Sequence, residues 1–453
     1  MRIWAKEALT AEGWRRDVAV TVDAEGRIES VTPGAAQDGV AVGALIPAPA
    51  NLHSHAFQRA MAGMTERRGP SGRDSFWTWR ELMYRFLEQL TPDDVAAIAA
   101  LVQVEMLEAG YAAIGEFHYL HHAPGGAPYD DLAAMAEAIA RAASETGIGL
   151  TLLPVLYEAG GCDGRPLAGG QRRFGCGPDQ FLRLHEACRG LLARLPADAA
   201  LGVAPHSLRA VSPEALQIAI DAAGDGPVHI HVSEQTAEVE EVLAHRGARP
   251  VEWLMANAPV GPHWCMIHLT HMTAEETRAV AESGAVAGLC PITESNLGDG
   301  VFNGVDYLAG GGRFGVGSDS NVRISLSEEL RTFEYSQRLS HRSRAALAKA
   351  GASTGRILLD GAAHGGAQAL RRASGVIAPG LWADLAALDT DHLTLQGKSE
   401  DGLLDAWIFA ADDRAVTDVW AAGRHMVVAG RHVARDAVEA DYRRVMGRLA
   451  ARL

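Results

Sequence analysis

Residues 213–234 read PEALQIAIDAAGDGPVHIHVSE, and this stretch contains the structural unit from which the fold is predicted. The segment from Pro213 to Ala223 has the apolar spacing of an amphipathic helix, with proline at its start and Gly224 just after its end. A short apolar run then begins at Val228 and leads into a histidine and a carboxylate. A helix followed closely by such a strand is typical of proteins that cover parallel strands with helices.

The same alternation of strand-length apolar runs and helical stretches extends over residues 48–373. Further helices are predicted at 92–109, 131–146 and 274–283. The predicted strands end near His53, Phe117, Leu156, Pro205, His231, His268, Leu289 and Gly317. Eight strands alternating with helices over about 300 residues favour an α/β fold, a closed (β/α)8 TIM-type barrel. An open doubly wound sheet is the alternative, but no Gly-x-Gly-x-x-Gly pattern lies between a predicted strand and the helix after it, where such a sheet binds a dinucleotide.

Both ends of the chain differ from the middle in their predicted secondary structure. Residues 1–47 contain short strands and turns, and short strands return in residues 374–453 before a final helix. Residues 1–47 are too few to stand alone. We therefore predict one small β-sandwich domain made from both termini, joined to a barrel that spans residues 48–373.

Composition restricts the class of protein. The chain has 453 residues, 48% of them hydrophobic, and a net charge of −15. Such a surface makes nucleic acid and anionic membranes poor partners. The chain shows no apolar run near the roughly 18 residues of a membrane span and no signal-peptide core, so a cytoplasmic location is expected. Its five cysteines form no Cys-x-x-Cys motif, which argues against a disulfide framework.

A pair of histidines follows the first predicted barrel strand. His53 and His55 are two residues apart, so their side chains point to the same side of the strand. At the carboxyl end of a barrel strand that side is the mouth where TIM-barrel active sites lie. Imidazole is a good ligand for Zn²⁺ and similar ions. The alternative is that these histidines are hydrogen-bonded core residues.

Other strand ends also carry residues that bind metal. His231, His268 and Asp319 stand at three later strand ends, and their recurrence favours a metal site over hydrogen-bonded core histidines. Three histidines and one aspartate suit a catalytic ion with a position left for water. The predicted metal ligands are His53, His55, His231 and Asp319. His229 lies on the same face as His231 but deeper, and it is the main rival ligand.

The lysine content bears on the number of metal ions. The chain has only three lysines, Lys6, Lys349 and Lys398, so the barrel strands cannot supply a bridging carboxylated lysine. A second ion bridged by a glutamate or a cysteine is the remaining alternative, but one metal ion is the simpler interpretation.

These residues resemble the amidohydrolase superfamily, in its cytosine-deaminase-like branch. The resemblance rests on His53-x-His55, His231, His268 and Asp319, together with GVIAPGLWADL at 375–385. It covers nearly the whole chain and implies the two-domain architecture predicted above. The superfamily's preference for zinc is implied as well, although iron or manganese could occupy such a site.

Longer stretches of the sequence make the resemblance more specific. They are NLHSHAFQRA at 51–60, DSFWTWRELM at 74–83, EFHY at 116–119, HSLR at 206–209 and ESNLGDG at 294–300. They are similar to the formimidoylglutamate deiminases of histidine degradation. This resemblance implies hydrolysis of N-formimidoyl-L-glutamate to N-formyl-L-glutamate and ammonia, and a homodimeric enzyme.

The implied reaction assigns roles to residues near the metal ligands. Glu234 is expected to take a proton from water and pass it to the departing nitrogen. His268 is expected to polarise or orient the attacked group. Asp319 is expected to share in proton transfer beyond its role as a ligand.

The implied substrate carries two carboxylates, and arginine pairs with carboxylates through two parallel hydrogen bonds. Arg80 and Arg209 fall within the family-like strings and are the candidates. Gln58, Tyr119 and His206 are expected to complete the pocket. Read without the resemblance, Arg80 would more simply be a helix or surface salt-bridge residue.

Two other functions stay open. A deaminase of a purine, pyrimidine or pterin ring could use the same scaffold, with aromatic stacking in place of paired arginines. A catalytically inactive barrel could serve as a binding protein, but the complete ligand set and Glu234 argue against it.

Overall fold

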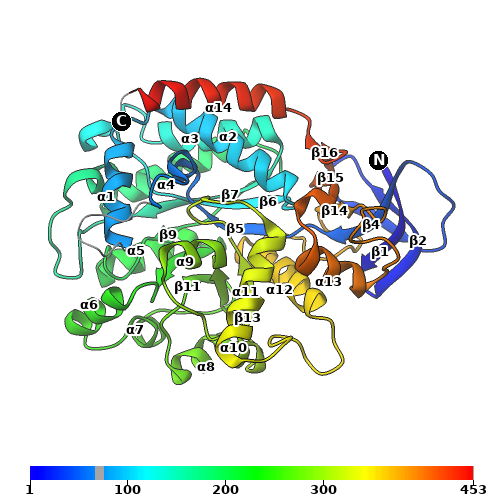
Figure 1. Ribbon diagram of the computed structural model, residues 1–453. Helices are drawn as coiled ribbons and strands as arrows, with labels where there is room; N and C mark the ends of the chain where they lie inside the picture. The colour runs from blue at the N-terminus through cyan, green and yellow to red at the C-terminus, as the bar shows by residue number, and fades with distance from the viewer. Residues whose placement is uncertain (67–75, 452–453) are drawn as a thin grey trace.

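A computed structural model of the chain describes residues 1–66 and 76–451, with only the backbone of residues 76–78, 80 and 81 (Figure 1). Parallel strands surrounded by helices form the larger body, and a smaller sheet lies at one side. The N-terminus lies in the smaller sheet, whereas the C-terminal helix crosses the top of the larger body in this view.

The barrel strands follow one another in chain order. They are β5 (Ala50–Ser54), β6 (Ala113–His118), β7 (Gly149–Leu156), β8 (Ala200–Leu201), β9 (Ala204–Pro205), β10 (Val228–Val232), β11 (Trp264–His268), β12 (Val286–Leu289) and β13 (Arg313–Val316). Parallel bridges complete the ring by joining Val203 to Val228 and Ser54 to Asp319. The predicted barrel is confirmed, and each predicted strand end lies within one residue of the observed end.

The barrel interior is apolar and tightly packed. β5, β6 and β7 are buried along their whole length, as expected for strands covered by helices on one side and by barrel core on the other. Leu52 is fully buried there, and a Cβ atom at Gly315 would lie 2.4 Å from its Cδ2 atom. Gly315 therefore lets β13 pack against β5, the strand that carries the His-x-His pair.

Local sequence signals explain where the helices begin and end. Thr91 and Asp94 form a capping box at one helix start, and the Ser212 hydroxyl accepts a hydrogen bond from the Ala215 amide at another. Gly147 and Gly284 end their helices in the left-handed conformation. The helices are α1 (Phe76–Leu87), α2 (Pro92–Glu108), α3 (Ala134–Thr146), α4 (Pro178–Leu192), α5 (Pro213–Ala223), α6 (Thr236–Arg246), α7 (Pro250–Asn257), α8 (Ala274–Ser283), α9 (Pro291–Leu297), α10 (Gly304–Ala309), α11 (Leu326–His341), α12 (Thr354–Ala369) and α13 (Asp401–Ala410).

Both ends of the chain supply strands to one eight-stranded sheet, in the order β17-β16-β15-β14-β4-β1-β2-β3. The N-terminal strands are β1 (Arg2–Thr10), β2 (Gly13–Val22), β3 (Ile28–Thr32) and β4 (Val40–Pro47). The C-terminal strands are β14 (Leu385–Leu388), β15 (Val416–Ala421), β16 (Arg424–Val428) and β17 (Arg431–His432). The two groups meet where β14 pairs antiparallel with β4. A small β domain built from both termini was predicted, and this sheet forms it.

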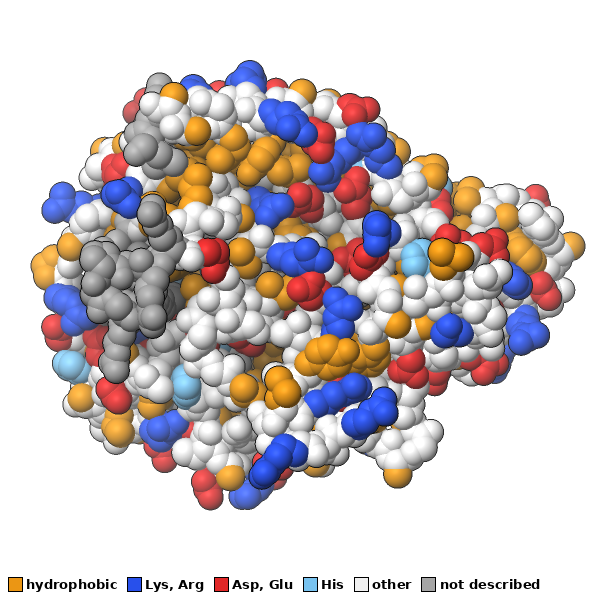
Figure 2. Space-filling model, viewed as in Figure 1, with side chains coloured by type: hydrophobic (Ala, Val, Ile, Leu, Met, Phe, Trp, Pro, Cys, Tyr) orange, Lys and Arg blue, Asp and Glu red, His pale blue; other side chains and the backbone are white. Residues whose placement is uncertain are grey.

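The last helix, α14 (Arg435–Ala450), follows the small sheet in sequence but lies along α2 of the barrel. Its buried residues are Val438, Val445 and Leu449, and Figure 2 shows apolar side chains gathered below the helix. A division of the chain at residue 374 therefore separates the strands, whereas α14 joins the barrel in space.

No helix in residues 1–66 and 76–451 combines the length and the apolar character that crossing a bilayer requires.

A buried ion network joins the barrel to the small sheet. Arg372, which follows α12, contacts Asp198 at 2.9 Å and Asp384 at 2.6 Å, and Arg424 of β16 also contacts Asp198. Replacing Arg372 by Met should lower the free energy of unfolding by about 3–5 kcal/mol, because buried Asp384 would lose its arginine partner and Asp198 would keep only Arg424. Urea unfolding measures the change. The control is Arg2→Met at the exposed Arg2–Asp38 pair, where less than about 1 kcal/mol is expected; equal effects would contradict the argument.

Candidate active site

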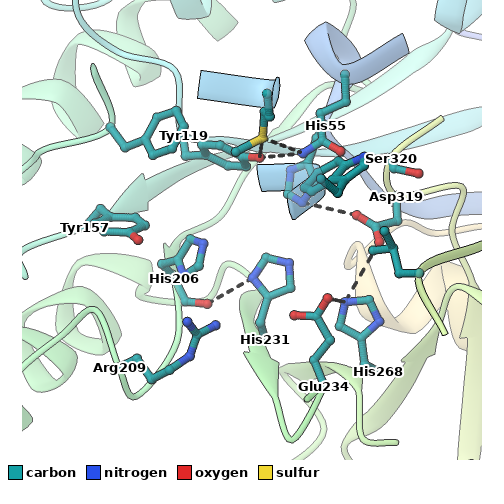
Figure 3. A pocket seen from close by; sticks show the side chains of 15 residues that line it. His55, Tyr119, Tyr157, His206, Arg209, His231, Glu234, His268, Asp319 and Ser320 are labelled. Atoms are coloured by element: carbon teal, nitrogen blue, oxygen red, sulfur yellow. Dashed lines mark hydrogen bonds and ion pairs between the residues drawn. The ribbon is translucent and has the colours of Figure 1, made fainter. Parts of the chain in front are cut away.

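Four side chains from three distant parts of the sequence meet at the carboxyl end of the barrel. Figure 3 shows His55, His231 and Asp319 of this cluster. His53 and His55 come from the end of β5, His231 from β10, and Asp319 from the turn after β13. The Nε2 atoms of His53 and His231 lie 3.1 Å apart. Asp319 Oδ1 lies 3.5 Å from His53 Nε2 and 3.3 Å from His55 Nε2. Ligand atoms around a tetrahedral zinc ion are separated by about 3.3 Å, so these spacings match such a site.

Hydrogen bonds determine which imidazole nitrogens carry lone pairs. His55 Nδ1 faces the carbonyl oxygen of Phe117 at 3.0 Å, and His231 Nδ1 faces that of His206 at 3.1 Å. A carbonyl only accepts, so Nδ1 is protonated in both rings and Nε2 carries a lone pair. Both Nε2 lone pairs point into the cluster, toward Asp319 and toward the third imidazole. A cation at the centre of the cluster would offset the electrostatic repulsion between these electron-rich atoms.

The charges in the cluster support the same conclusion. Burial lowers the pKa of His53 to about 3 and also lowers the pKa of His55 and His231, so all three rings are neutral near pH 7. Burial acts to raise the pKa of Asp319, but hydrogen bonding and charge interactions with the imidazoles hold it well below its usual value. Neutral imidazoles and an ionised carboxylate are the protonation states that bind a divalent ion.

The backbone brings the two barrel edges together at this point. The Asp319 amide donates to the His53 carbonyl at 3.0 Å, and the His55 amide donates to the Asp319 carbonyl at 3.0 Å. A Cβ atom at Gly317 would lie 2.8 Å from that of His53, so only glycine permits the approach. Asp319 itself has a φ of 48°, in the left-handed region. Strained backbone of this kind is common where function fixes a side chain.

Glu234 and His268 lie beside the cluster and face each other. His268 Nε2 lies 3.8 Å from Glu234 Oε1 and 3.9 Å from Asp319 Oδ2. Burial raises the pKa of Glu234 to about 7. Burial acts to lower the pKa of His268, but the carboxylates of Glu234, Glu294 and Asp319 raise it to about 10. The pair therefore combines a carboxyl group that can exchange protons near neutrality with a cationic hydrogen-bond donor.

A cavity opens over the cluster and encloses about 570 Å³, including its mouth. Of the predicted pocket residues, Gln58, Tyr119, His206 and Arg209 line it. Gln58 Nε2 donates to the Tyr119 hydroxyl at 2.6 Å. The structure also brings in residues that the sequence did not single out as pocket residues: Trp79, Met83, Tyr157, Phe174, Leu297 and Ser320.

Two residues considered in the sequence analysis, Arg80 and His229, are not found among the described residues of the cluster or the cavity lining. The side chain of Arg80 lies outside the described part of the structure, so its contact with substrate stays a prediction. His229, the rival ligand, turns away from the cluster: its Nε2 lies 2.8 Å from the Ala369 carbonyl oxygen. Both His229 and His231 face the barrel interior, but only His231 reaches the mouth.

Two acidic residues near the site were missed as functional candidates. Glu294 contacts the His268 ring, and Asp299 lies close enough to Glu234 for their charges to interact. Both belong to the string ESNLGDG, which the sequence identified only by resemblance. The residue types alone gave no indication of a role, because α9 folds them back toward β11.

A parallel barrel with this cluster at its carboxyl mouth defines a hydrolase of the amidohydrolase type. The amidohydrolase family model matches residues 44–426, and the model described as formimidoylglutamate deiminase HutF, N-terminal domain, matches residues 1–40. The chain belongs to the amidohydrolase family and, within it, to the formimidoylglutamate deiminases, as the sequence predicted.

Relatives cover the whole chain. Formimidoylglutamate deiminase of Pseudomonas aeruginosa is 48% identical over 99% of both chains, whereas 8-oxoguanine deaminase of the same organism is 28% identical over 91% of both. A crystal structure of an amidohydrolase from Brucella melitensis superposes with a TM-score of 0.94 at 49% identity over 99% of both chains. A zinc-bound adenosine deaminase from Xanthomonas campestris shares the fold, with a TM-score of 0.83 at 23% identity over 99% of this chain and 98% of its own.

Proposed function

We propose that this chain hydrolyses N-formimidoyl-L-glutamate to N-formyl-L-glutamate and ammonia, a step of histidine degradation. The observation that carries the proposal is the convergence of three neutral imidazoles, a carboxylate and a proton-transfer pair in one cavity. The substrate comes from membership of the deiminase family, whose Pseudomonas aeruginosa member bears that name.

We infer that one divalent ion per chain is held by His53, His55, His231 and Asp319, and we propose that it is zinc. Three imidazoles with a carboxylate are a ligand set that zinc accepts in hydrolases. When bound, such an ion lowers the pKa of water toward neutrality and draws charge from the attacked group. No lysine occurs between Lys6 and Lys349, so the barrel strands offer no carboxylated lysine to bridge two ions, and this supports a single ion.

Glu234 and its neighbours would move the protons. Glu234 accepts a proton as the water oxygen bonds to the formimidoyl carbon, and it passes that proton to the imino nitrogen. A second proton moves from the new hydroxyl group, through Asp319 or Glu234, to the same nitrogen. The C–N bond then breaks, ammonia leaves and the carbonyl forms. His268 donates a hydrogen bond to the oxygen on which negative charge develops.

Arg209 is the described residue best placed to bind a substrate carboxylate. It lines the cavity, and its Nε is buried without a hydrogen-bond partner among the described residues. Burial acts to lower its pKa, but nearby carboxylates, with Glu238 foremost, raise it, so the guanidinium stays charged. We propose that Arg209 and Arg80 each pair with one carboxylate, and that Gln58, Tyr119 and His206 add hydrogen bonds.

Replacing Arg209 by Met should lower kcat/KM by about 100-fold, mostly through KM. Two charge-assisted hydrogen bonds to substrate would be lost, together worth about 3 kcal/mol. Steady-state kinetics with formimidoylglutamate measures the change, and Arg209→Lys should recover only part of it because lysine cannot form the two-pronged contact. A fall in kcat alone, with KM unchanged, would contradict this role.

Ammonia release tests the function directly. We expect turnover of N-formimidoyl-L-glutamate and none of guanine or cytosine under the same conditions. The reverse preference would support the ring deaminase, and a protein with neither metal nor activity would support the inactive barrel.

We further propose that the enzyme acts as a homodimer in the cytoplasm. Sedimentation of the purified chain tests the first statement, and fractionation of cells tests the second.

A further inference from the structure

The string ESNLGDG places a carboxylate directly behind His268. Glu294 lies in α9, and its Oε1 is 3.2 Å from Nδ1 of His268. The same oxygen accepts a hydrogen bond from the Cys290 amide at 2.9 Å. Both side chains are buried. Nε2 of His268, on the opposite side of the ring, faces Glu234 and Asp319.

A carboxylate in this position restricts the imidazole in two ways. An ionised carboxylate only accepts hydrogen bonds, so it requires a proton on Nδ1 of His268. It also fixes the ring plane, because Glu294 is itself held by the Cys290 amide. His268 has a φ of 74°, a left-handed conformation that leaves its direction dependent on such contacts.

We propose that Glu294 is a positioning residue for deimination, which accepts a hydrogen bond from the Nδ1–H of His268 and so aims Nε2 of that ring at the reacting group. The inference rests on the proposed function, because it requires His268 to act on the substrate. Glu294 itself stands behind the ring and touches no reacting atom. The arrangement is that of a hydrogen-bonded orienting partner, whose loss can cost an enzyme a large part of its rate without loss of binding.

The chain offers a matched control in Glu329. This residue of α11 is also a fully buried glutamate, and its Oε2 accepts a hydrogen bond from the Ile292 amide at 2.9 Å. Both glutamates therefore hold the first turn of α9. Burial raises the pKa of Glu329 well above its usual value, so glutamine reproduces its neutral form. Among the described residues no hydrogen bond or ion pair joins Glu329 to His268, so only Glu294 should act through that ring.

The experiment compares Glu294→Gln with Glu329→Gln, after the parent enzyme has been shown to release ammonia from N-formimidoyl-L-glutamate. An amide can present either its oxygen or its NH2 group to Nδ1, so E294Q no longer fixes the proton on Nδ1 or the orientation of the ring. We expect E294Q to lower kcat roughly 100-fold or more, with KM and metal content within about threefold of the parent. E329Q should keep kcat within about threefold.

A double-mutant cycle separates positioning from structure. If Glu294 acts through His268, E294Q should have little further effect on kcat once His268 is already Asn. Equal losses in E294Q and E329Q, or an undiminished E294Q effect in the H268N background, would overturn the proposal. If E294Q fails to fold, Glu294→Asp decides: a tenfold or greater loss of kcat supports the role, and an unchanged kcat overturns it. A parent enzyme inactive on formimidoylglutamate would instead refute the proposed function.

Discussion

Replacing Glu234 by Gln is expected to lower kcat by about 1,000-fold or more while the protein keeps its metal ion. The carboxyl group is the one described acid beside the cluster that combines a position facing His268, at 3.8 Å, with a pKa near 7. Glutamine has nearly the same shape but cannot accept the proton of water, so both proton transfers lose their carrier. General acid–base catalysis is worth about 100- to 10,000-fold, and one residue is used here twice.

The control for this variant is Glu240→Gln. Glu240 is exposed on α6, the helix that follows Glu234. Its replacement by glutamine should leave turnover unchanged. Ammonia release and metal analysis of both proteins make the comparison. An E234Q protein with parental activity would remove Glu234 from the mechanism.

The second large effect is expected at the metal ligands, where β10 offers a matched pair. His231→Asn should reduce the metal content and lower turnover by about 10,000-fold or more, because the ligand set would be incomplete and a metal ion can supply several kcal/mol to catalysis. His229→Asn should keep one ion per chain, since His229 contacts the Ala369 carbonyl rather than the cluster.

Metal analysis by mass spectrometry and ammonia release distinguish the two variants. Chelation of the parent enzyme should reproduce the H231N loss, and added zinc should restore it. Loss of metal in H229N with retention in H231N would show that the ligand set is misassigned.

The barrel could be predicted closely from sequence because its strands, except β8 and the first residue of β13, are buried and mostly apolar runs. Such runs have a clear end, and the proposed metal ligands stand at those ends. The choice between His229 and His231 was harder, because a spacing of two puts both on the interior face. Only depth separates them, and the strand's direction placed His231 at the mouth.

Other parts of the site depend on tertiary folding that no local pattern records. Tyr157 and Phe174 reach the cavity from opposite ends of a glycine-rich loop, and Leu297 reaches it from α9. Glu294 lies 26 residues beyond the histidine it contacts. The path of α14 is similar: its apolar residues indicate a buried face, but not that α2 of the barrel would cover it.

The central claim is that one ion lies among His53, His55, His231 and Asp319. Anomalous X-ray diffraction from crystals of the enzyme, at the absorption edge of the bound metal, tests it most directly. The account predicts a single peak per chain, about 2.0–2.2 Å from the three Nε2 atoms and from a carboxylate oxygen of Asp319. A peak at the other buried group of metal-binding residues, His268, Cys290 and Glu294, or no peak in an active crystal, would contradict it.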